Sequence, residues 1–145
     1  MKIDTIEYVS NLKELINDGQ DVVITVAGSS MTPFLRHQRD RVLLKKPPFA
    51  LKVDDIVFYQ RKTGQYVLHR IYKVKSDGYY MMGDRQIALE GPIKADAIFA
   101  IVAEIERNGR WLSAESFVWR LASVMWRILY PLRKLAYLAR KAIRK

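Results

Sequence analysis

The sequence predicts a mainly β protein: a small coiled β-sheet or partial barrel between an N-terminal amphipathic helix and a C-terminal basic amphipathic helical tail. Short runs rich in β-branched and aromatic residues alternate with tight-turn signals from residue 21 to residue 113. Helical apolar spacing comes before these runs, and a cationic, apolar segment comes after them. We therefore divide the chain into a helix at 1–20, a β domain at 21–113 and a tail at 114–145.

Composition sets the class of protein and removes several kinds of chemistry. The chain has 145 residues, half of them apolar, which is enough for one domain with a hydrophobic core. It has no cysteine, which excludes a disulfide, a thiol nucleophile and a thiolate metal site. Its two histidines, His37 and His69, are too few for a histidine-based zinc site without carboxylate ligands. Phosphate-loop and dinucleotide motifs are also absent, so we expect no metal and no cofactor.

The first segment predicts a helix that packs on the domain. Apolar residues fall near helical spacing from Thr5 to Asn17, and Asp18-Gly19 ends the pattern. The segment lacks the basic start and apolar run of a signal peptide, and no stretch of the chain is apolar enough to span a membrane. We therefore expect a cytoplasmic protein.

The β domain is predicted from strand runs and the turns between them. The turn signals are Thr63-Gly64, Asp77-Gly78 and, strongest of all, Asn108-Gly109, which is typical of a two-residue hairpin. The predicted strands are Asp21–Ala27, Asp40–Lys46, Asp55–Gln60, Tyr66–Val74, Tyr79–Met82, Ala97–Arg107 and Arg110–Ser113.

The tail differs from the rest of the chain in charge. Eight of the 25 Lys and Arg residues, and none of the 15 Asp and Glu residues, lie between Ser116 and Lys145. Pro131 predicts a kink or break near Tyr130. A wide apolar face, a cationic stripe at seven-residue spacing and interfacial tryptophans favour an in-plane membrane helix over a cover for the domain core or a partner's groove. The predicted membrane-binding residues are Trp119, Arg120, Trp126, Arg127, Lys134 and Lys141.

One bend in the β domain is suited to hold a nucleophile. The first strand stops at Gly28, which is followed by Ser29, Ser30 and Met31. A small residue at a bend lets a substrate backbone approach a hydroxyl, and Met31 can turn inward as an apolar anchor. We assign Gly28, Ser29 and Met31 to substrate binding or the oxyanion hole. The structural alternative is a serine-rich turn.

A serine hydroxyl needs a base within hydrogen-bonding reach, and His69 is the best candidate. Strand alternation places it on one face with Val67 and Ile71, where apolar surroundings would keep the imidazole neutral. Asp84, which follows a glycine at a strand end, would orient the imidazole. The structural alternatives are a core histidine and a turn aspartate.

Taken in order, these motifs resemble the box series of type I signal peptidases. The matching segments are Gly28–Pro33, Arg39–Leu44, Val53–Phe58, Leu68–Ile71 and Gly83-Asp84, within a region from roughly Val22 to Ala103. The resemblance implies the fold that this superfamily shares with LexA-type self-cleaving repressors. It also implies that Ser30 is the nucleophile. The His69-Arg70 pair is similar to the branch found in archaea, the endoplasmic reticulum and sporulation, in which histidine is the base.

The resemblance leaves two acidic residues in competition and includes three departures. Asp84 matches the Gly-Asp box, whereas Glu90 is near the position of a second acidic residue in that branch. Gly28 and Ser29 stand in reversed order, so we name only the Ser30 N–H as an oxyanion donor. Arg39 and Asp54 replace glycines, which predicts altered turns. The N-terminal anchor is absent, and we expect the basic tail to substitute for it.

These observations favour a serine endopeptidase that cleaves a peptide precursor or leader at the inner face of the membrane. Its expected partners are that precursor and an anionic membrane surface. The alternative is an inactive β domain that serves as a cationic membrane- or nucleic-acid-binding module or a LexA-like regulator. The tail's apolar face argues against nucleic acid, and the roughly 20 residues before the β domain are too few for a helix-turn-helix.

Overall fold

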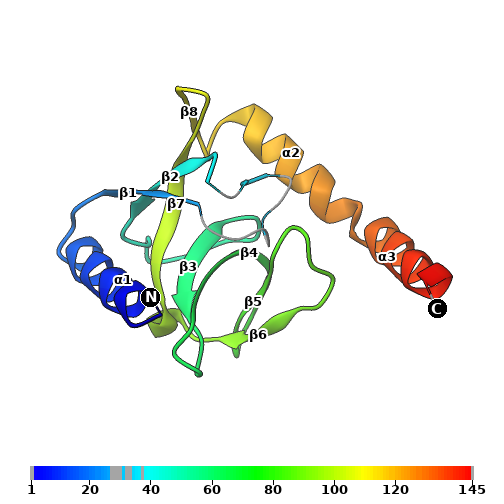
Figure 1. The fold of residues 1–145 in the computed structure, drawn as a ribbon, viewed down its shortest axis with the longest axis horizontal. Coiled ribbons are helices and arrows are strands. Elements are labelled where there is room, and N and C mark those ends of the chain that lie inside the picture. Colours follow the sequence, from blue (N-terminus) through cyan, green and yellow to red (C-terminus); the bar gives the residue numbers. More distant parts are fainter. Residues whose placement is uncertain (1, 27–30, 32–33, 37, 145) are drawn as a thin grey trace.

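The computed structural model describes residues 2–26, 31, 34–36 and 38–144, and it describes side chains between residues 10 and 143 of these ranges. Within them the chain forms an antiparallel β-sheet and three α-helices (Figure 1). The helices are α1 (Lys2–Asn17), α2 (Phe117–Ile128) and α3 (Tyr130–Arg144), and η1 (Ala95–Ala97) is a short 3-10 helix.

The eight strands form one sheet in the order β1-β2-β7-β3-β4-β5-β6, and β8 pairs with β7. The path ends at β1 and β6, so the sheet is not closed into a barrel. The prediction of a mainly β protein is confirmed. The strands are β1 (Val22–Thr25), β2 (Arg41–Lys45), β3 (Ile56–Gln60), β4 (Tyr66–Lys75), β5 (Gly78–Met82), β6 (Glu90–Ile93), β7 (Ile98–Arg107) and β8 (Arg110–Ser113).

The hairpin between β7 and β8 forms where the sequence predicts it. Asn108 and Gly109 have φ angles of 54° and 79°, as a tight hairpin turn with two positive φ values requires. Arg107 and Arg110 pair directly across this turn. Asparagine and glycine are the residues that enter this region at least cost, which is why the dipeptide predicts the turn.

The core lies on both faces of the sheet, and β3 contributes to each. Phe58 belongs to a larger cluster, whereas its neighbours Val57 and Tyr59 point to a smaller cluster on the opposite face. The larger cluster includes Ile16, Met31, Leu35, Val42, Leu44, Val102, Ile105 and Trp119, and the smaller one includes Leu51, Ile71, Met81 and Ile98.

Two helices cover the larger cluster. In α1, Leu12 and Ile16 are four residues apart and both are buried, so one stripe of the helix faces the sheet. In α2, Trp119 and Ser123 are buried with the same spacing. The helix begins after Ser116, whose hydroxyl accepts a hydrogen bond from the backbone N–H of Trp119. By contrast, α3 extends away from the sheet (Figure 1).

The structure confirms the helix break predicted from Pro131 and differs from the sequence prediction at two other places. The tail forms two helices that end and begin on either side of Leu129, close to the break expected from Pro131. The short strand β6 and the helix η1 were not predicted, because Glu90–Ile93 contains Gly and Pro and lacks an alternating pattern. Asp54 adopts a φ of 78°, so it keeps the left-handed conformation natural to glycine rather than altering the turn.

Candidate active site

His69 lies on β4, on the face of the smaller core cluster. The pairing of β3 with β4 sets Val57 opposite His69 and Tyr59 opposite Val67. Tyr59 and His69 are therefore diagonal neighbours on one face, which brings their side chains into reach of each other. Only 2% of His69 is exposed, in agreement with the apolar surroundings predicted for it.

A chain of hydrogen bonds connects His69 to a carboxylate on the edge of the sheet. The Tyr59 hydroxyl oxygen lies 3.2 Å from Nδ1 of His69. The same hydroxyl group donates to Oε2 of Glu90, at 2.8 Å. Glu90 also accepts from Arg61, whose Nε lies 3.0 Å from both carboxylate oxygens. The sheet thus curls enough for Glu90 on β6 to meet two residues at and just beyond the end of β3.

The electrostatics of this chain favour a neutral histidine beside an ionised glutamate. Burial, with a smaller effect from the positive charge of Arg61, lowers the pKa of His69 to about 4, although Glu90 opposes the shift. Burial raises the pKa of Glu90, but the hydrogen bonds from Arg61 and Tyr59 outweigh it, so the pKa is lowered. Burial and Glu90 together raise the pKa of Tyr59 above its ordinary value. At neutral pH the imidazole can therefore accept a proton.

Asp84 occupies a different place from the one predicted for it. Its two carboxylate oxygens accept hydrogen bonds from Nε and Nη2 of Arg70, at 2.7 and 2.8 Å. Both side chains are fully buried. Adjacent residues on a strand point to opposite faces, so Arg70 and its partner lie on the other side of the sheet from His69. The prediction that Asp84 supports His69 is therefore wrong, and its competitor Glu90 is the acidic residue connected to the imidazole.

The predicted nucleophile Ser30 lies outside the described residues, as do Gly28 and Ser29. Their described neighbours show how the segment is attached. Met31 is 2% exposed and packs in the larger core cluster, as expected of an inward anchor. On either side of the undescribed residues, the backbone N–H of Val26 donates to the carbonyl of Asp40. The described residues Val26 and Asp40 are therefore hydrogen-bonded to each other.

Asp40 connects the described residues just before β2 to β7 of the sheet. It is fully buried, and its carboxylate accepts hydrogen bonds from Arg39, from Arg107 on β7 and from the backbone N–H of Arg36. The Arg39 and Arg107 hydrogen bonds and charges outweigh the effect of burial and lower the pKa of Asp40, so the carboxylate is ionised at neutral pH. Arg39, at a position where the sequence resemblance led us to expect an altered turn, is therefore an ion-pair partner of Asp40.

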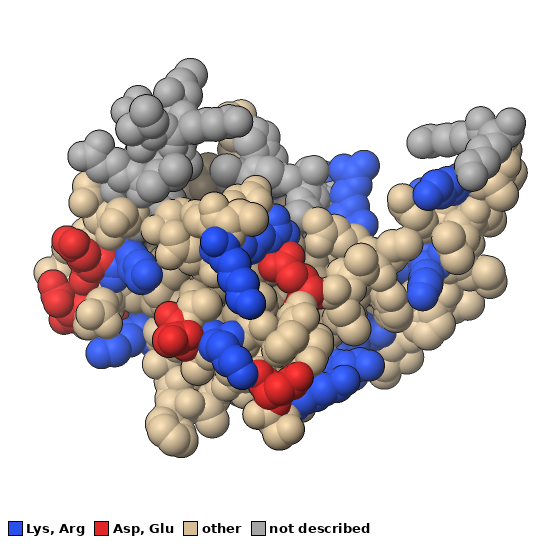
Figure 2. Space-filling view, turned by 90° about the horizontal axis from the view of Figure 1, so that it is seen from below, with Lys and Arg blue, Asp and Glu red and all other residues tan. Residues whose placement is uncertain are grey.

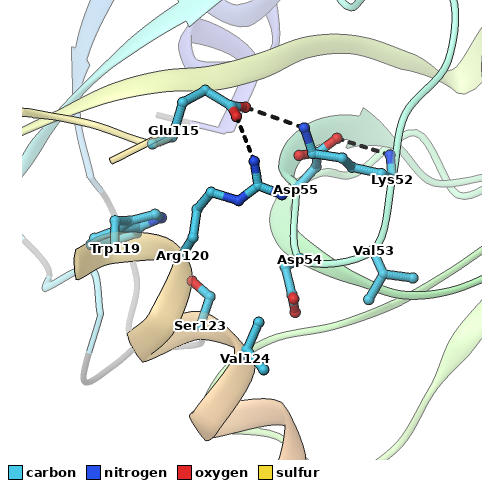
Figure 3. Close-up of a pocket in the computed structure, with 10 residues that line it drawn as sticks. Lys52, Val53, Asp54, Asp55, Glu115, Trp119, Arg120, Ser123 and Val124 are labelled. Carbon is cyan, nitrogen blue, oxygen red and sulfur yellow. Dashed lines mark hydrogen bonds and ion pairs between the residues drawn. The ribbon is translucent and has the colours of Figure 1, made fainter. Parts of the chain in front are cut away.

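The first half of the tail is bound to the domain through charge pairs. In Figure 3, Glu115 joins Arg120 of α2 to Lys52, at 2.9 and 3.4 Å. Further along the same helix, Arg127 lies 2.9 Å from the carboxylate of Asp54. Arg120 and Arg127, which the sequence assigns to membrane binding, therefore pair with acidic groups outside the helix. A glycine at position 54 could not form this ion pair with Arg127.

The two tail tryptophans also pack on the domain. Trp119 is 8% exposed within the larger core cluster, so its assignment to membrane binding is wrong. Trp126 is half-buried, and its indole N–H donates to the carbonyl of Asp84 at 3.0 Å. Arg133 of α3 donates to the same carbonyl at 3.1 Å and stacks over Trp126. Lys134 and Lys141 are exposed on α3, as a membrane-binding role requires.

An open cleft lies beside Glu90, where the chain of hydrogen bonds from His69 ends. The segment 85–91 lines one side of it, and Arg61 and Tyr137 of α3 complete the lining. Tyr130 at the start of α3 donates to the carbonyl of Ile87, which ties the helix to this segment. Within the described parts of the chain, no group of three or more His, Cys, Asp or Glu residues is placed to hold a metal ion.

Sequence reasoning missed Tyr59 and Arg61. The signal that could have found Tyr59 is the hairpin turn at Thr63-Gly64, because it fixes the pairing of the two flanking strands. With Gln60 opposite Tyr66, Tyr59 falls on the face of His69. Arg61 could not be found in this way, since its position beside Glu90 depends on the curl of the sheet.

Comparison with known proteins adds no assignment. No protein-family model matches the chain, and the search of curated proteins finds no similar sequence.

Proposed function

We propose that this protein is a serine endopeptidase that resembles signal peptidases and works at a membrane surface. The observation that carries the proposal is the buried imidazole of His69, connected through the Tyr59 hydroxyl to the carboxylate of Glu90. A histidine that only filled the core would need a hydrogen-bond partner such as Tyr59, but it would not need a carboxylate such as Glu90 bound to that partner. A base oriented by an acidic group is the arrangement that serine acylation uses.

The reaction would take two steps. Ser30 Oγ attacks the carbonyl carbon of the scissile peptide bond while Nε2 of His69 accepts the hydroxyl proton. The imidazolium then returns this proton to the leaving amine, and the C–N bond breaks to leave an acyl-enzyme. Water, activated by the same nitrogen, hydrolyses the ester and restores both side chains. The backbone N–H of Ser30 is our proposed donor to the oxyanion.

The substrate that suits this surface is an extended peptide. The sheet ends at β6, an edge strand that carries Glu90 and borders the open cleft. An extended segment can bind beside such an edge through backbone hydrogen bonds. Because α3 contributes Tyr137 to the cleft, a peptide bound there would lie next to the tail. We therefore propose a precursor or leader peptide presented close to the membrane.

The exposed face of α3 supports membrane association. Leu132, Leu135 and Ile143 are 63%, 64% and 84% exposed, and helical geometry places them on one face. Arg133, which projects from a different side of the helix, contacts the domain. A helix that covered the core would point its leucines inward, whereas these point outward. None of the described helices is long and apolar enough to cross a bilayer, so we propose that α3 lies in the interface.

Charge indicates which bilayer surface would bind the tail. No acidic residue follows Glu115 in the sequence, and in Figure 2 the arm at the right shows blue cations and no red. The body of the domain carries both signs in the same view. Lys134, Arg140 and Lys141 on α3 would therefore attract anionic lipids, which are enriched on the cytoplasmic leaflet.

We expect Leu132→Ser with Leu135→Ser to weaken binding to anionic vesicles by roughly 100-fold, since each leucine removed from the interface forfeits about 1.5 kcal/mol or more. Co-sedimentation with vesicles of phosphatidylserine and phosphatidylcholine measures this. Val23→Ser with Val74→Ser is the matched control, because both valines are exposed on strands. Equal binding by the leucine variant, or no binding by the unaltered protein, would contradict the membrane role.

The peptidase activity is tested by digestion of a random peptide library, with and without anionic vesicles, with products read by mass spectrometry. We expect discrete cleavage sites that disappear in Ser30→Ala and persist in Ser76→Ala, which alters an exposed serine in a turn. Cleavage that survives Ser30→Ala would show that another group or a contaminant is responsible. Vesicle binding without Ser30-dependent cleavage would favour the inactive membrane-binding module.

A further inference from the structure

We infer that Tyr59 is a positioning residue that fixes the tautomer of His69, with the proton on Nδ1 and the lone pair on Nε2. The inference about the tautomer rests on the hydrogen-bond geometry alone. Its consequence for catalysis rests on the proposed peptidase function. Tyr59 has this role because its hydroxyl lies between the imidazole of His69 and the carboxylate of Glu90. No sequence motif indicates this position.

The charge on Glu90 determines which group donates in its hydrogen bond with Tyr59. Arg61 holds this carboxylate with Nε at 3.0 Å and with Nη2 at 2.8 Å, a fork that binds the ionised form. An ionised carboxylate has no proton to donate and can only accept hydrogen bonds. The hydrogen bond of 2.8 Å between Tyr59 and Glu90 must therefore use the phenolic proton.

Tyr59 has one proton for two hydrogen-bond contacts. A phenol has one O–H group, and Glu90 accepts it. The remaining contact of the phenolic oxygen, 3.2 Å from Nδ1 of His69, can only be one in which the oxygen accepts. Nδ1 must then carry the proton, and in the neutral imidazole Nε2 is left as the proton acceptor. This is the tautomer that a serine base needs.

Tyr59, His69 and Glu90 are held in place by paired strands. Tyr59 and His69 lie on adjacent strands in the interior of the sheet, and Glu90 is paired with Met81 of β5. Tyr59 is fully buried and its ring contacts the imidazole edge-on, with centroids 6.0 Å apart. The orientation of the imidazole is thus set by strand register rather than by a loop. The phenol stays protonated throughout, because burial beside Glu90 disfavours its ionisation and raises its pKa.

This arrangement also places a phenol between the imidazolium that forms during catalysis and the carboxylate of Glu90, which is already charged at rest. When Nε2 accepts a proton, the Nδ1–H bond to Tyr59 strengthens and the phenol passes the polarisation to Glu90. A carboxylate in direct contact would hold the imidazolium more tightly. With a phenol between them, His69 remains neutral in the resting protein and still has an anion to stabilise its charged form.

Heteronuclear NMR of the imidazole nitrogens tests the assignment at neutral pH. We expect the unaltered protein to show His69 protonated on Nδ1. Both Tyr59→Phe, which removes the acceptor of this proton, and Glu90→Ala, which lets the phenol donate to Nδ1 instead, should shift His69 toward the Nε2-protonated form. Tyr66→Phe is the control, because Tyr66 lies on the opposite face of β4. An Nε2-protonated His69 in the unaltered protein, or no change in either variant, would overturn the inference.

Kinetics give the catalytic consequence. We expect Tyr59→Phe to lower kcat by about 100-fold with little change in KM, since the wrong tautomer impairs proton transfer and not peptide binding. An unchanged kcat would show that Tyr59 does not position the base. The NMR measurement requires no substrate, so it would support the tautomer even if peptide digestion showed no Ser30-dependent cleavage. In that case the proposed function would fail and the structural inference would stand.

Discussion

Replacement of His69 by asparagine should lower kcat/KM for peptide cleavage on the order of 10⁴-fold or more, because Ser30 then has no base to accept its proton. Asparagine is polar and smaller than histidine, so the sheet can still form around it. Vesicle binding and the thermal unfolding of the variant serve as controls for folding. A loss of less than about tenfold would show that His69 is a core residue and not the base.

The pH profile of the unaltered protein sharpens this prediction. Burial and the charge of Arg61 lower the pKa of His69 to about 4, with Glu90 opposing and Tyr59 in contact. Below that pH the imidazole is protonated and cannot accept a proton from Ser30. We therefore expect kcat/KM to rise with pH through about 4 and to stay level towards neutrality. An inflection near the ordinary histidine pKa would contradict the buried environment.

Removal of Asp84 should be the most destabilising of the changes considered, at about 3–5 kcal/mol for Asp84→Ala, since it leaves the buried guanidinium of Arg70 without a partner. The double variant Arg70→Met with Asp84→Leu should recover most of this loss, because it removes both charges and fills the space with apolar groups. Urea denaturation monitored by tryptophan fluorescence measures each free energy of unfolding.

An exposed ion pair provides the comparison for the buried pair of Arg70 and Asp84. Arg120 and Glu115 are about half exposed, so Glu115→Ala should cost less than about 1 kcal/mol. If Asp84→Ala cost no more than that, the ion pair with Arg70 would not be the reason for its burial. If Asp84→Ala instead abolished cleavage and left stability unchanged, the assignment of Glu90 as the acidic residue behind His69 would be wrong.

Local chemistry explains which parts of the fold could be predicted from the sequence. Asn108-Gly109 specifies a hairpin because both residues tolerate positive φ, and Pro131 specifies a helix break because it lacks an N–H. The strands β3, β4 and β5 follow from alternation and turn signals between them. These features depend on neighbours in the chain, so the sequence records them directly.

The parts that could not be predicted depend on contacts between distant elements. In the sequence, Asp84 follows a glycine at a strand end and is typical of a turn aspartate. Only the pairing of β4 with β5 shows that it forms an ion pair with Arg70. Trp119 fits both a membrane helix and a core, and the apolar cluster it enters is built from several strands, a helix and loops far away in the sequence. Glu90 meets Tyr59 because the sheet curls, which no local pattern encodes.

The tail illustrates how one pattern can have two outcomes in one segment. Helices α2 and α3 both combine apolar and cationic residues, yet α2 packs its tryptophan inward and α3 exposes its leucines. The difference lies in the partners that the domain offers. Asp54 and Glu115 pair with cations of α2, whereas the described contacts of α3 with the domain are made at its start, by Tyr130 and Arg133, and through the cleft wall at Tyr137.

The measurement that most directly tests the Ser30–His69 mechanism is the rate at which an electrophilic serine probe acylates the purified protein, read by intact mass across the pH range. We predict a single adduct on Ser30, formed at a rate that falls below a midpoint near pH 4 because the pKa of His69 is about 4. Ser30→Ala should abolish the adduct, and His69→Asn should slow its formation strongly. An adduct on another residue, or a rate on Ser30 that His69→Asn leaves unchanged, would contradict the mechanism.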